Sequence, residues 1–429
     1  MRWFLFLVLA AFSWAARMLG DATVSDPVGS ALLSLGILII GGVLAGELAV
    51  RFRAPRITGY LVLGMVAGPH ALGLETARDA QLLRIFEELA LGLIALTAGG
   101  EFRLKTVRRR LRPLLALTAA HTVGILVLVA GGLWLVLKVV PFLGSVTPAE
   151  TFAAVALLGV IAVAVSPSTT IAVIAELRAR GEMVETVLSV TIIKDLVILL
   201  LFTLVNTMAL SLLFGGAPDL GDLVHVGLEI LGSLLAGAVL GTMLGLYIAK
   251  VGRLVPLTVL ALALASAELA HQSWMEHLLV CMAAGFTARN LYPRAAGHFL
   301  DALEQSSTPV YVVFFALIGA GLNIRIFAAL WLPALIYVLV RGVGVWLMTG
   351  FPASAAGSGR HMVRFGWMGF VAQAGLSLGL AARIQREIPG IGSTVATLVV
   401  AAVVVNQLVG PILWERAILA AGEQGQVRK

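Results

Sequence analysis

The sequence predicts an all-α polytopic membrane protein, and two observations support that fold class. Of the 429 residues, 60% are hydrophobic and only 12% are charged, and the mean hydropathy is +1.00. A soluble protein carries about twice that charged fraction, roughly 25%. Apolar runs long enough to cross a bilayer, which takes about 20 residues, recur from one end of the chain to the other. The composition therefore leaves no room for a soluble domain of any size.

Reading these runs in order gives 13 membrane-spanning helices. They are predicted at 28–50, 57–74, 83–100, 112–139, 151–175, 184–206, 223–249, 254–271, 274–291, 307–323, 327–349, 362–382 and 391–415. Ahead of them, Arg2 is followed by a short apolar stretch within residues 1–22. A basic start before a short apolar core is typical of a cleaved signal peptide, which we favour, although the stretch also suits a fourteenth span.

The net charge of +7 indicates topology and not a nucleic-acid partner. Most of the 30 Lys and Arg residues fall in alternate connections between the predicted spans and in the tail 416–429. By the positive-inside rule, those connections and the tail are cytoplasmic in a multi-pass protein of the bacterial inner membrane. Cys281 is the only cysteine and lies in an apolar span, so neither a disulfide framework nor a thiolate metal cluster is expected. We also expect no cofactor.

The 13 spans divide as six, one and six. Residues 28–206 form one half, 223–249 a linker helix, and 254–415 the other half. An odd linker between two sets of six spans places the halves in opposite orientations, which is the inverted-repeat plan of many secondary transporters. The linker carries small residues at Gly237, Gly241 and Gly245, a spacing that favours close packing against another helix.

The fifth span of each half contains a predicted break. In the first half, Pro167 removes a backbone donor and clashes with the preceding turn, so the helix must kink or open there. The matching span 362–382 has no proline, but it carries polar or small residues at mid-membrane depth. The two segments together supply the predicted substrate-lining residues Ser166, Pro167, Ser168, Thr169, Thr170, Gln373 and Gly375. Opened half-helices direct N–H groups and carbonyls at one site. The alternative is an ordinary proline kink in a packed helix.

Two adjacent charges, Lys194 and Asp195, lie at the centre of the apolar span 184–206. A charge at that depth costs roughly 2.5–3.5 kcal/mol on insertion scales and persists mainly where it faces a protein interior or a watery cavity. Asp195 can bind either a proton or, transiently, a monovalent metal cation, which makes it the predicted exchange site. Lys194 has three interpretations. It is a counter-ion for Asp195, it exchanges a proton itself, or it points away and anchors a carbonyl on another helix.

Arg341 also lies within an apolar span, 327–349. We expect it to pair with an acidic residue near another span end, or to extend toward the membrane surface, and thus to be a structural charge.

Three segments resemble a known family. They are Pro55 to Leu74 (PRITGYLVLGMVAGPHALGL), Glu88 to Glu101 (ELALGLIALTAGGE) and Phe314 to Leu322 (FFALIGAGL). The first resembles the first-core-helix signature of the monovalent cation:proton antiporters, and more narrowly of the antiporter-2 branch, which includes Kef-type and bacterial Na+/H+ antiporters. The resemblance covers about residues 28 to 415.

The resemblance implies a homodimer of 13-span protomers in membrane lipid, with a core domain that moves against a dimerisation domain in an elevator-like cycle. It further implies that Asp195 is the ion- and proton-binding aspartate of the sixth span. The preceding residue is usually Asp, Asn or Gln in the family, whereas here it is Lys194. The helix with Phe314 also lacks the basic residue that electrogenic members place opposite the aspartate.

The function predicted from these observations is exchange of Na+ or K+ for H+ by a secondary active transporter, which is not an enzyme. The lysine leaves two alternatives. One is a proton-coupled carrier of an anion or organic solute, and the other is a non-transporting sensor of the same fold.

Overall fold

The computed structural model describes residues 27–52, 54–101, 104, 111–139, 143, 146–215, 221–272, 275–293, 296–321 and 330–425. Within these ranges all regular structure is helical. Seven of the described helices are long and apolar enough to cross a membrane, and three more apolar helices are shorter, at Arg56–Ala67, Val255–Ala270 and Val310–Gly321. The protein is therefore a multi-pass membrane protein. The predicted signal peptide or extra span at 1–22 lies outside the described residues.

The chain divides into two compact units, each made of two separate stretches. Unit 1 comprises Met1–Glu101 and Ala236–Arg325, and unit 2 comprises Phe102–Leu235 and Ile326–Lys429. Each unit thus draws helices from both predicted halves of the chain.

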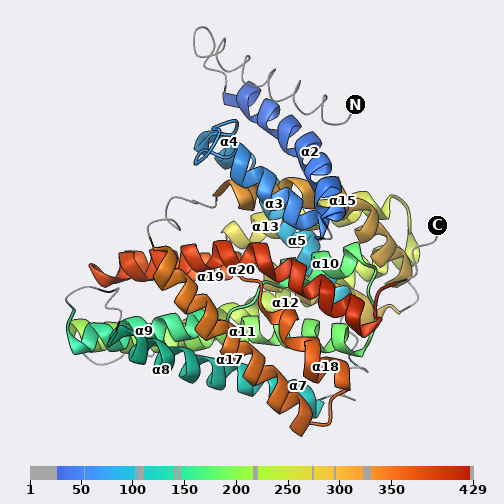
Figure 1. Ribbon diagram of the computed structural model, residues 1–429. Helices are drawn as coiled ribbons and strands as arrows, with labels where there is room; N and C mark the ends of the chain where they lie inside the picture. Colours follow the sequence, from blue (N-terminus) through green and yellow to red (C-terminus); the bar gives the residue numbers. More distant parts are fainter. Residues whose placement is uncertain are drawn as a thin grey trace, which may run out of the picture. The chain divides into compact units, whose positions relative to one another are not determined.

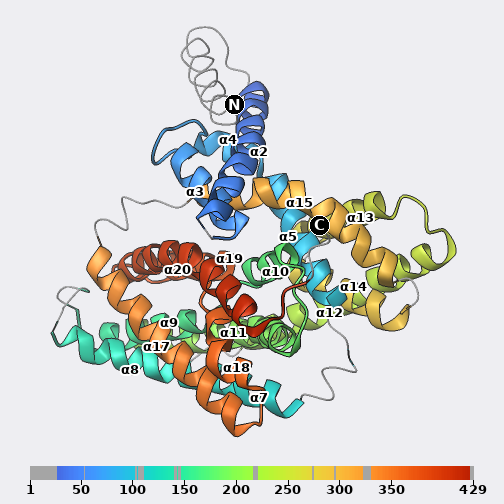
Figure 2. The same ribbon diagram turned by 45° about the vertical axis from the view of Figure 1, so that its right-hand side comes forward.

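Unit 1 contains eight described helices in whole or in part. They are α2 (Pro27–Arg51), α3 (Arg56–Ala67), α4 (Ala77–Leu82), α5 (Arg84–Glu101), the second half of α12 (Gly221–Lys250), α13 (Val255–Gln272), α14 (His277–Leu291) and, with these, α15 (Ala296–Gly321). Helix α14 packs along α5 (Figure 2), and α3 packs against both α2 and α15 (Figures 1 and 2). Two glycines of the segments that resemble the antiporter family, Gly64 of α3 and Gly319 of α15, lie where the backbones of these two helices approach each other. A Cβ on Gly64 would lie 1.9 Å from the Ala316 carbonyl oxygen, and one on Gly319 would lie 2.2 Å from that of Leu61.

One predicted span of unit 1 is shorter than expected. The helix predicted at 57–74 ends at Ala67, and Gly68 closes it with extended backbone. The physical reason is Pro69, because the residue before a proline is disfavoured in the helical region.

The small residues of the linker helix pack as predicted. A Cβ on Gly237 would lie 2.3 Å from the Val280 carbonyl oxygen, and one on Gly241 would lie 2.3 Å from that of Ala284. Both partners belong to α14, so the row lets α12 and α14 approach at backbone distance.

Unit 2 contains the two helices with predicted breaks. Its elements are α7 (Leu111–Ala119), the π-helix η1 (Ala120–Ile125), α8 (Leu126–Leu137), α9 (Pro148–Val163), α10 (Pro167–Glu176), α11 (Glu182–Phe214), the first half of α12, α17 (Trp331–Ala355), α18 (Arg360–Phe365), the 3-10 helix η2 (Gly366–Phe370), α19 (Gly375–Glu387) and α20 (Ile391–Ala421). In both views α8 lies beside α9, and α19 beside α20 (Figures 1 and 2). The span predicted at 112–139 is one path of three elements, since η1 widens the helix at its centre.

Candidate functional site

The first break lies where Pro167 predicts it. Helix α9 ends at Val163, Ala164–Ser166 are non-helical, and α10 begins at Pro167. Pro167 suits the first helical position because its missing N–H would have no partner there. Ser166 is the N-cap of α10, and its Oγ accepts the backbone N–H of Thr169 at 3.2 Å. The sequence Ser-Pro-Ser-Thr therefore both ends one half-helix and starts the next.

The second break forms without a proline. The 3-10 helix η2 ends at Phe370, residues 371–374 are non-helical, and α19 begins at Gly375. Gln373 spans the opening. Its Nε2 donates to the Ile161 carbonyl at 2.9 Å, and its Oε1 accepts from Asn406 Nδ2 at 2.8 Å. The polar residue that predicted this break is thus one of the groups that hold it open.

The two breaks pair with each other. The backbone N–H of Ser166 donates to the Ala372 carbonyl at 2.9 Å, although the residues are far apart in sequence. This bond, together with the Gln373 bond to Ile161, shows that the opened segments pass each other inside unit 2. Unwound backbone within a membrane is tolerated only where protein satisfies its polar groups, and here each break supplies partners for the other.

Arg341 satisfies the carbonyls that the breaks leave without helical partners. Arg341 is 1% exposed, and its guanidinium donates four hydrogen bonds. The acceptors are the carbonyls of Ala162 (2.9 Å), Ala164 (2.9 Å), Phe370 (3.1 Å) and Val371 (2.8 Å). The last carbonyls of a helix have no intrahelical partner and carry partial negative charge, so a cation is favoured beside them. Arg341 therefore joins the ends of α9 and η2.

This result corrects the predicted partner of Arg341. We expected an acidic side chain or the membrane surface, and the structure places four backbone carbonyls there instead. One turn earlier on α17, the buried Tyr337 hydroxyl donates to the Leu158 carbonyl of α9 at 3.1 Å. Tyr337 and Arg341 thus both hold the first broken helix from α17.

The predicted oxygen ligands form a closed hydrogen-bonded cluster. Ser166 Oγ lies 2.9 Å from both Ser168 Oγ and Thr169 Oγ1. Thr170 Oγ1 donates to the Ser166 carbonyl at 3.0 Å. Gln407 Nε2, from α20, donates to Thr169 Oγ1 at 2.9 Å. In this conformation the hydroxyl groups bind one another, the Ser166 carbonyl and Gln407. They therefore stabilise the place where the two opened segments pass each other, which we call the crossing.

Two residues that bind the breaks were missed in the sequence, Asn406, which donates to Gln373, and Gln407, which donates to Thr169. Both are buried on α20, at 2% and 0% exposure. The signal that could have found them is the one that identified Lys194 and Asp195, namely two adjacent polar residues deep in an apolar span.

Lys194 points to a residue that the sequence did not single out, His121. Both side chains are 0% exposed, and Lys194 Nζ lies 3.1 Å from His121 Nδ1. The Lys194 ammonium also lies 5.4 Å from the ring centroid of Phe370, the last residue of η2. The ring of His121 packs edge-on against the same phenyl ring, with 4.5 Å between centroids. Of the three interpretations of Lys194, the geometry is nearest to the one in which it points to another helix.

Asp195 follows Lys194 on α11 and is half-buried. Adjacent helical residues point about 100° apart, so the carboxylate and the ammonium leave the helix in different directions. Since Lys194 lies against Phe370, directly before the second break, Asp195 belongs to the same region of unit 2.

The start of α11 is held by the C-terminal segment. The Glu423 carboxylate accepts the backbone N–H groups of Met183 (2.9 Å) and Val184 (2.8 Å). Arg180 N–H donates to the Glu423 carbonyl at 2.8 Å. A carboxylate suits the positive end of a helix, so residues beyond α20 fix the helix that carries Lys194 and Asp195.

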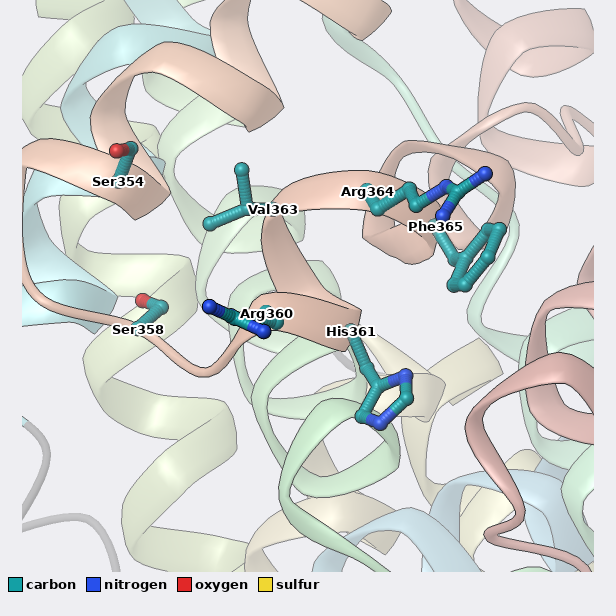
Figure 3. A pocket seen from close by; sticks show the side chains of 7 residues that line it. All are labelled: Ser354, Ser358, Arg360, His361, Val363, Arg364 and Phe365. Carbon is teal, nitrogen blue, oxygen red and sulfur yellow. The ribbon is translucent and has the colours of Figure 1, made fainter.

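A separate pocket of about 620 Å³ lies between the end of α17 and α18. It is lined by Ser354, Ser358, Arg360, His361, Val363, Arg364 and Phe365. Figure 3 shows that the guanidinium groups of Arg360 and Arg364 point in different directions, and Arg364 lies over the Phe365 ring. None of the predicted site residues lines this pocket.

Comparisons with known proteins agree with this architecture. A family model described as "Sodium/hydrogen exchanger, transmembrane" matches residues 34–415. The chain is similar to the "Probable Na(+)/H(+) antiporter GerT" of Bacillus cereus, with 24% identity over 176 residues, 40% of this chain. That match spans 42% of the relative's length.

Two solved structures of the sodium proton antiporter MjNhaP1 from Methanocaldococcus jannaschii also resemble this chain. The one determined at pH 8 has a TM-score of 0.68 at 17% identity and covers 94% of this chain and 100% of its own. The electron-microscopy structure has a TM-score of 0.70 at 17% identity and covers 92% and 99%. At this identity the likeness shows the fold.

Proposed function

Because the chain belongs to the sodium/hydrogen exchanger family, within the monovalent cation:proton antiporters, we propose that it exchanges Na+ or K+ for H+ with Asp195 as the shared site. The observation that carries the assignment to Asp195 is the pair of crossing helix breaks in the unit that holds this carboxylate. Transporter sites lie where matching helices of two repeats are discontinuous, near mid-membrane. Lys194, the neighbour of Asp195, contacts the residue directly before one of these breaks.

Asp195 supports exchange because a carboxylate cannot hold a proton and a metal cation on the same oxygens at once. A proton and a bound monovalent cation each neutralise the same carboxylate charge. The proton and the metal cation then compete for the Asp195 carboxylate, and this competition is the requirement for antiport. Monovalent alkali cations prefer oxygen ligands, and the Asp195 carboxylate supplies a charged oxygen ligand.

The hydroxyls of Ser166, Thr169 and Thr170 have a different role in this proposal from the one expected. Their hydrogen bonds go to each other, to Gln407 and to backbone. A cation could use these oxygens only if one such bond were exchanged, so we assign them primarily to holding the crossing open. Asp195 remains the exchanging ligand.

The division into units suits an elevator cycle. All of the proposed site residues, from Ser166 to Gly375, belong to unit 2. We therefore assign unit 2 as the transporting core and unit 1 as the dimerisation domain of a homodimer. We place the protein in the bacterial inner membrane with its C-terminus in the cytoplasm, because the basic connections lie on that side. The two inverted repeats at 28–206 and 254–415 are part of the same proposal.

The test uses purified protein in liposomes that contain a pH-reporting dye. A pH gradient is imposed, and Na+, K+ or Li+ salts are added to wild type, Asp195→Asn and Glu268→Gln. The control replaces an exposed carboxylate on α13 that pairs with Gln272. We expect cation-driven proton flux in wild type and in the control, and none in Asp195→Asn. A wild-type trace that stays flat with every cation at several pH values would contradict antiport.

A second candidate, a proton-coupled anion carrier, is favoured by one observation. Lys194 and Arg341 are both buried in unit 2, so two cationic side chains accompany one half-buried carboxylate. Flux of a labelled anion that is lost in Lys194→Asn would support this carrier. Cation binding without any transport would instead favour the third alternative, a non-transporting sensor of the same fold.

A further inference from the structure

His121 is a fully buried histidine that lies outside every sequence motif discussed above, yet it makes the hydrogen bond that orients Lys194. We propose that His121 is a positioning residue for the cation site. By holding the Lys194 ammonium against η2, it keeps that ammonium from pairing with the Asp195 carboxylate and so sets the apparent affinity for the transported cation. This inference rests on the proposed antiport at Asp195.

The hydrogen-bond chain fixes which ring nitrogen accepts. The Thr349 hydroxyl donates its only hydrogen to the Val345 carbonyl at 2.6 Å. Because that hydrogen is used, Thr349 Oγ1 can only accept from His121 Nε2, which lies 3.0 Å away. Nε2 therefore carries the hydrogen, and Nδ1 presents a lone pair. Lys194 Nζ, at 3.1 Å from Nδ1, is the donor.

The local fold is arranged to present this ring. His121 lies in η1, where the helix between α7 and α8 widens to a π-helix. Single π turns inside α-helices are rare and occur frequently at functional sites. The ring is enclosed by Phe370 on one side and by Thr349 on the other. Three elements, η1, η2 and α17, thus meet at the end of the Lys194 side chain.

Without this acceptor, Asp195 is the natural partner of Lys194. The two residues are adjacent, and a lysine side chain has a flexible four-carbon stem. Among the described residues, the hydrogen bond of Lys194 goes to His121 and not to Asp195. The Arg341 guanidinium of α17 also acts on Lys194 and repels its ammonium. A Lys194 ammonium released from His121 would therefore move toward the carboxylate and compete there with the transported cation.

The experiment compares two amide substitutions of similar size in the liposome assay. His121→Asn places an amide oxygen near the position of Nδ1, so it can still accept from Lys194. His121→Gln places its amide near Nε2, where it meets Thr349 and leaves Lys194 without its acceptor. We expect the KM for the cation to rise about tenfold in His121→Gln, the ratio set by one lost charge-assisted hydrogen bond. We expect kcat to change little, and His121→Asn to stay close to wild type.

A second background separates positioning from simple structural support. In Lys194→Met protein there is no ammonium to misplace, so adding His121→Gln should leave KM unchanged. An equal rise of KM in both backgrounds would overturn the proposal, as would an unchanged KM in the single His121→Gln variant. A wild type without cation-driven flux would instead mean that the proposed antiport has failed. Elution from a size-exclusion column and thermal unfolding in detergent verify that each variant is folded.

Discussion

Arg341 offers the sharpest test of how the crossing is held together, through the substitution Arg341→Lys. The guanidinium makes four hydrogen bonds to carbonyls of both breaks. A lysine ammonium has three donors but no planar fork, so we expect it to reach about two of the four carbonyls. Each hydrogen bond from a charged group contributes about 1.5–3 kcal/mol, so two lost bonds cost about 3 kcal/mol at the lower end. We use the lower end of this energy range because water can partly replace the two lost hydrogen bonds.

The assay is the free energy of unfolding in mixed detergent micelles, titrated with a denaturing detergent. Tyr337→Phe is the matched control, because it removes one neutral hydrogen bond from the same helix to the same broken segment. It should cost about 1 kcal/mol. The reasoning is refuted if Arg341→Lys unfolds at the wild-type free energy, or if Tyr337→Phe destabilises the protein as much as Arg341→Lys does.

Two further predictions concern the ends and the packing of helices. Glu423→Gln should weaken the charge-based cap of α11 by about 1 kcal/mol. Amide hydrogen exchange of the segment that starts at Met183 should then become faster, whereas the exposed Gln424→Ala should leave it unchanged. Gly237→Ala should lower the thermal stability, because its Cβ would lie 2.3 Å from the Val280 carbonyl oxygen. Gly227→Ala is its control on the same helix, where a Cβ would meet nothing within 4 Å, and it should stabilise by up to about 1 kcal/mol.

The two breaks show how much of the site the sequence could predict. The first break can be predicted from proline alone, because the proline ring excludes a helical hydrogen bond whatever surrounds it. The structure agrees, since α10 begins at Pro167. The second break was found from Gln373 and Gly375 at mid-membrane depth, and α19 begins at Gly375. In both cases the signal is local. The pairing of the two breaks through Ser166 and Ala372 is not local and needed the fold.

Arg341 shows why the predicted partner was wrong. A search for an opposite charge considers side chains only, whereas helix ends expose carbonyls that carry partial negative charge. The residues that Arg341 reaches at the end of α9, Ala162 and Ala164, are 179 and 177 positions away in the chain. No periodicity within α17 contains that information.

His121 was missed for the opposite reason, since its own surroundings in the sequence look ordinary. A lone histidine in an apolar span is more often a satisfied core residue than part of a site. Its role as a partner of Lys194, 73 positions away, follows from the π turn and from the packing of η2 and α17 around it.

The sequence by itself determined the membrane-embedded helical class, the positions of both breaks and the charged pair Lys194–Asp195. These follow from hydropathy, proline geometry and the cost of a charge in lipid, which depend only on residues close together in the chain. Only the tertiary structure decided what Arg341 and Lys194 bind, and that Asn406, Gln407 and His121 belong to the same core. A hydrogen bond depends on the positions of two groups within about 3 Å, and chain segments 29 to 238 residues apart acquire those positions only when the helices pack.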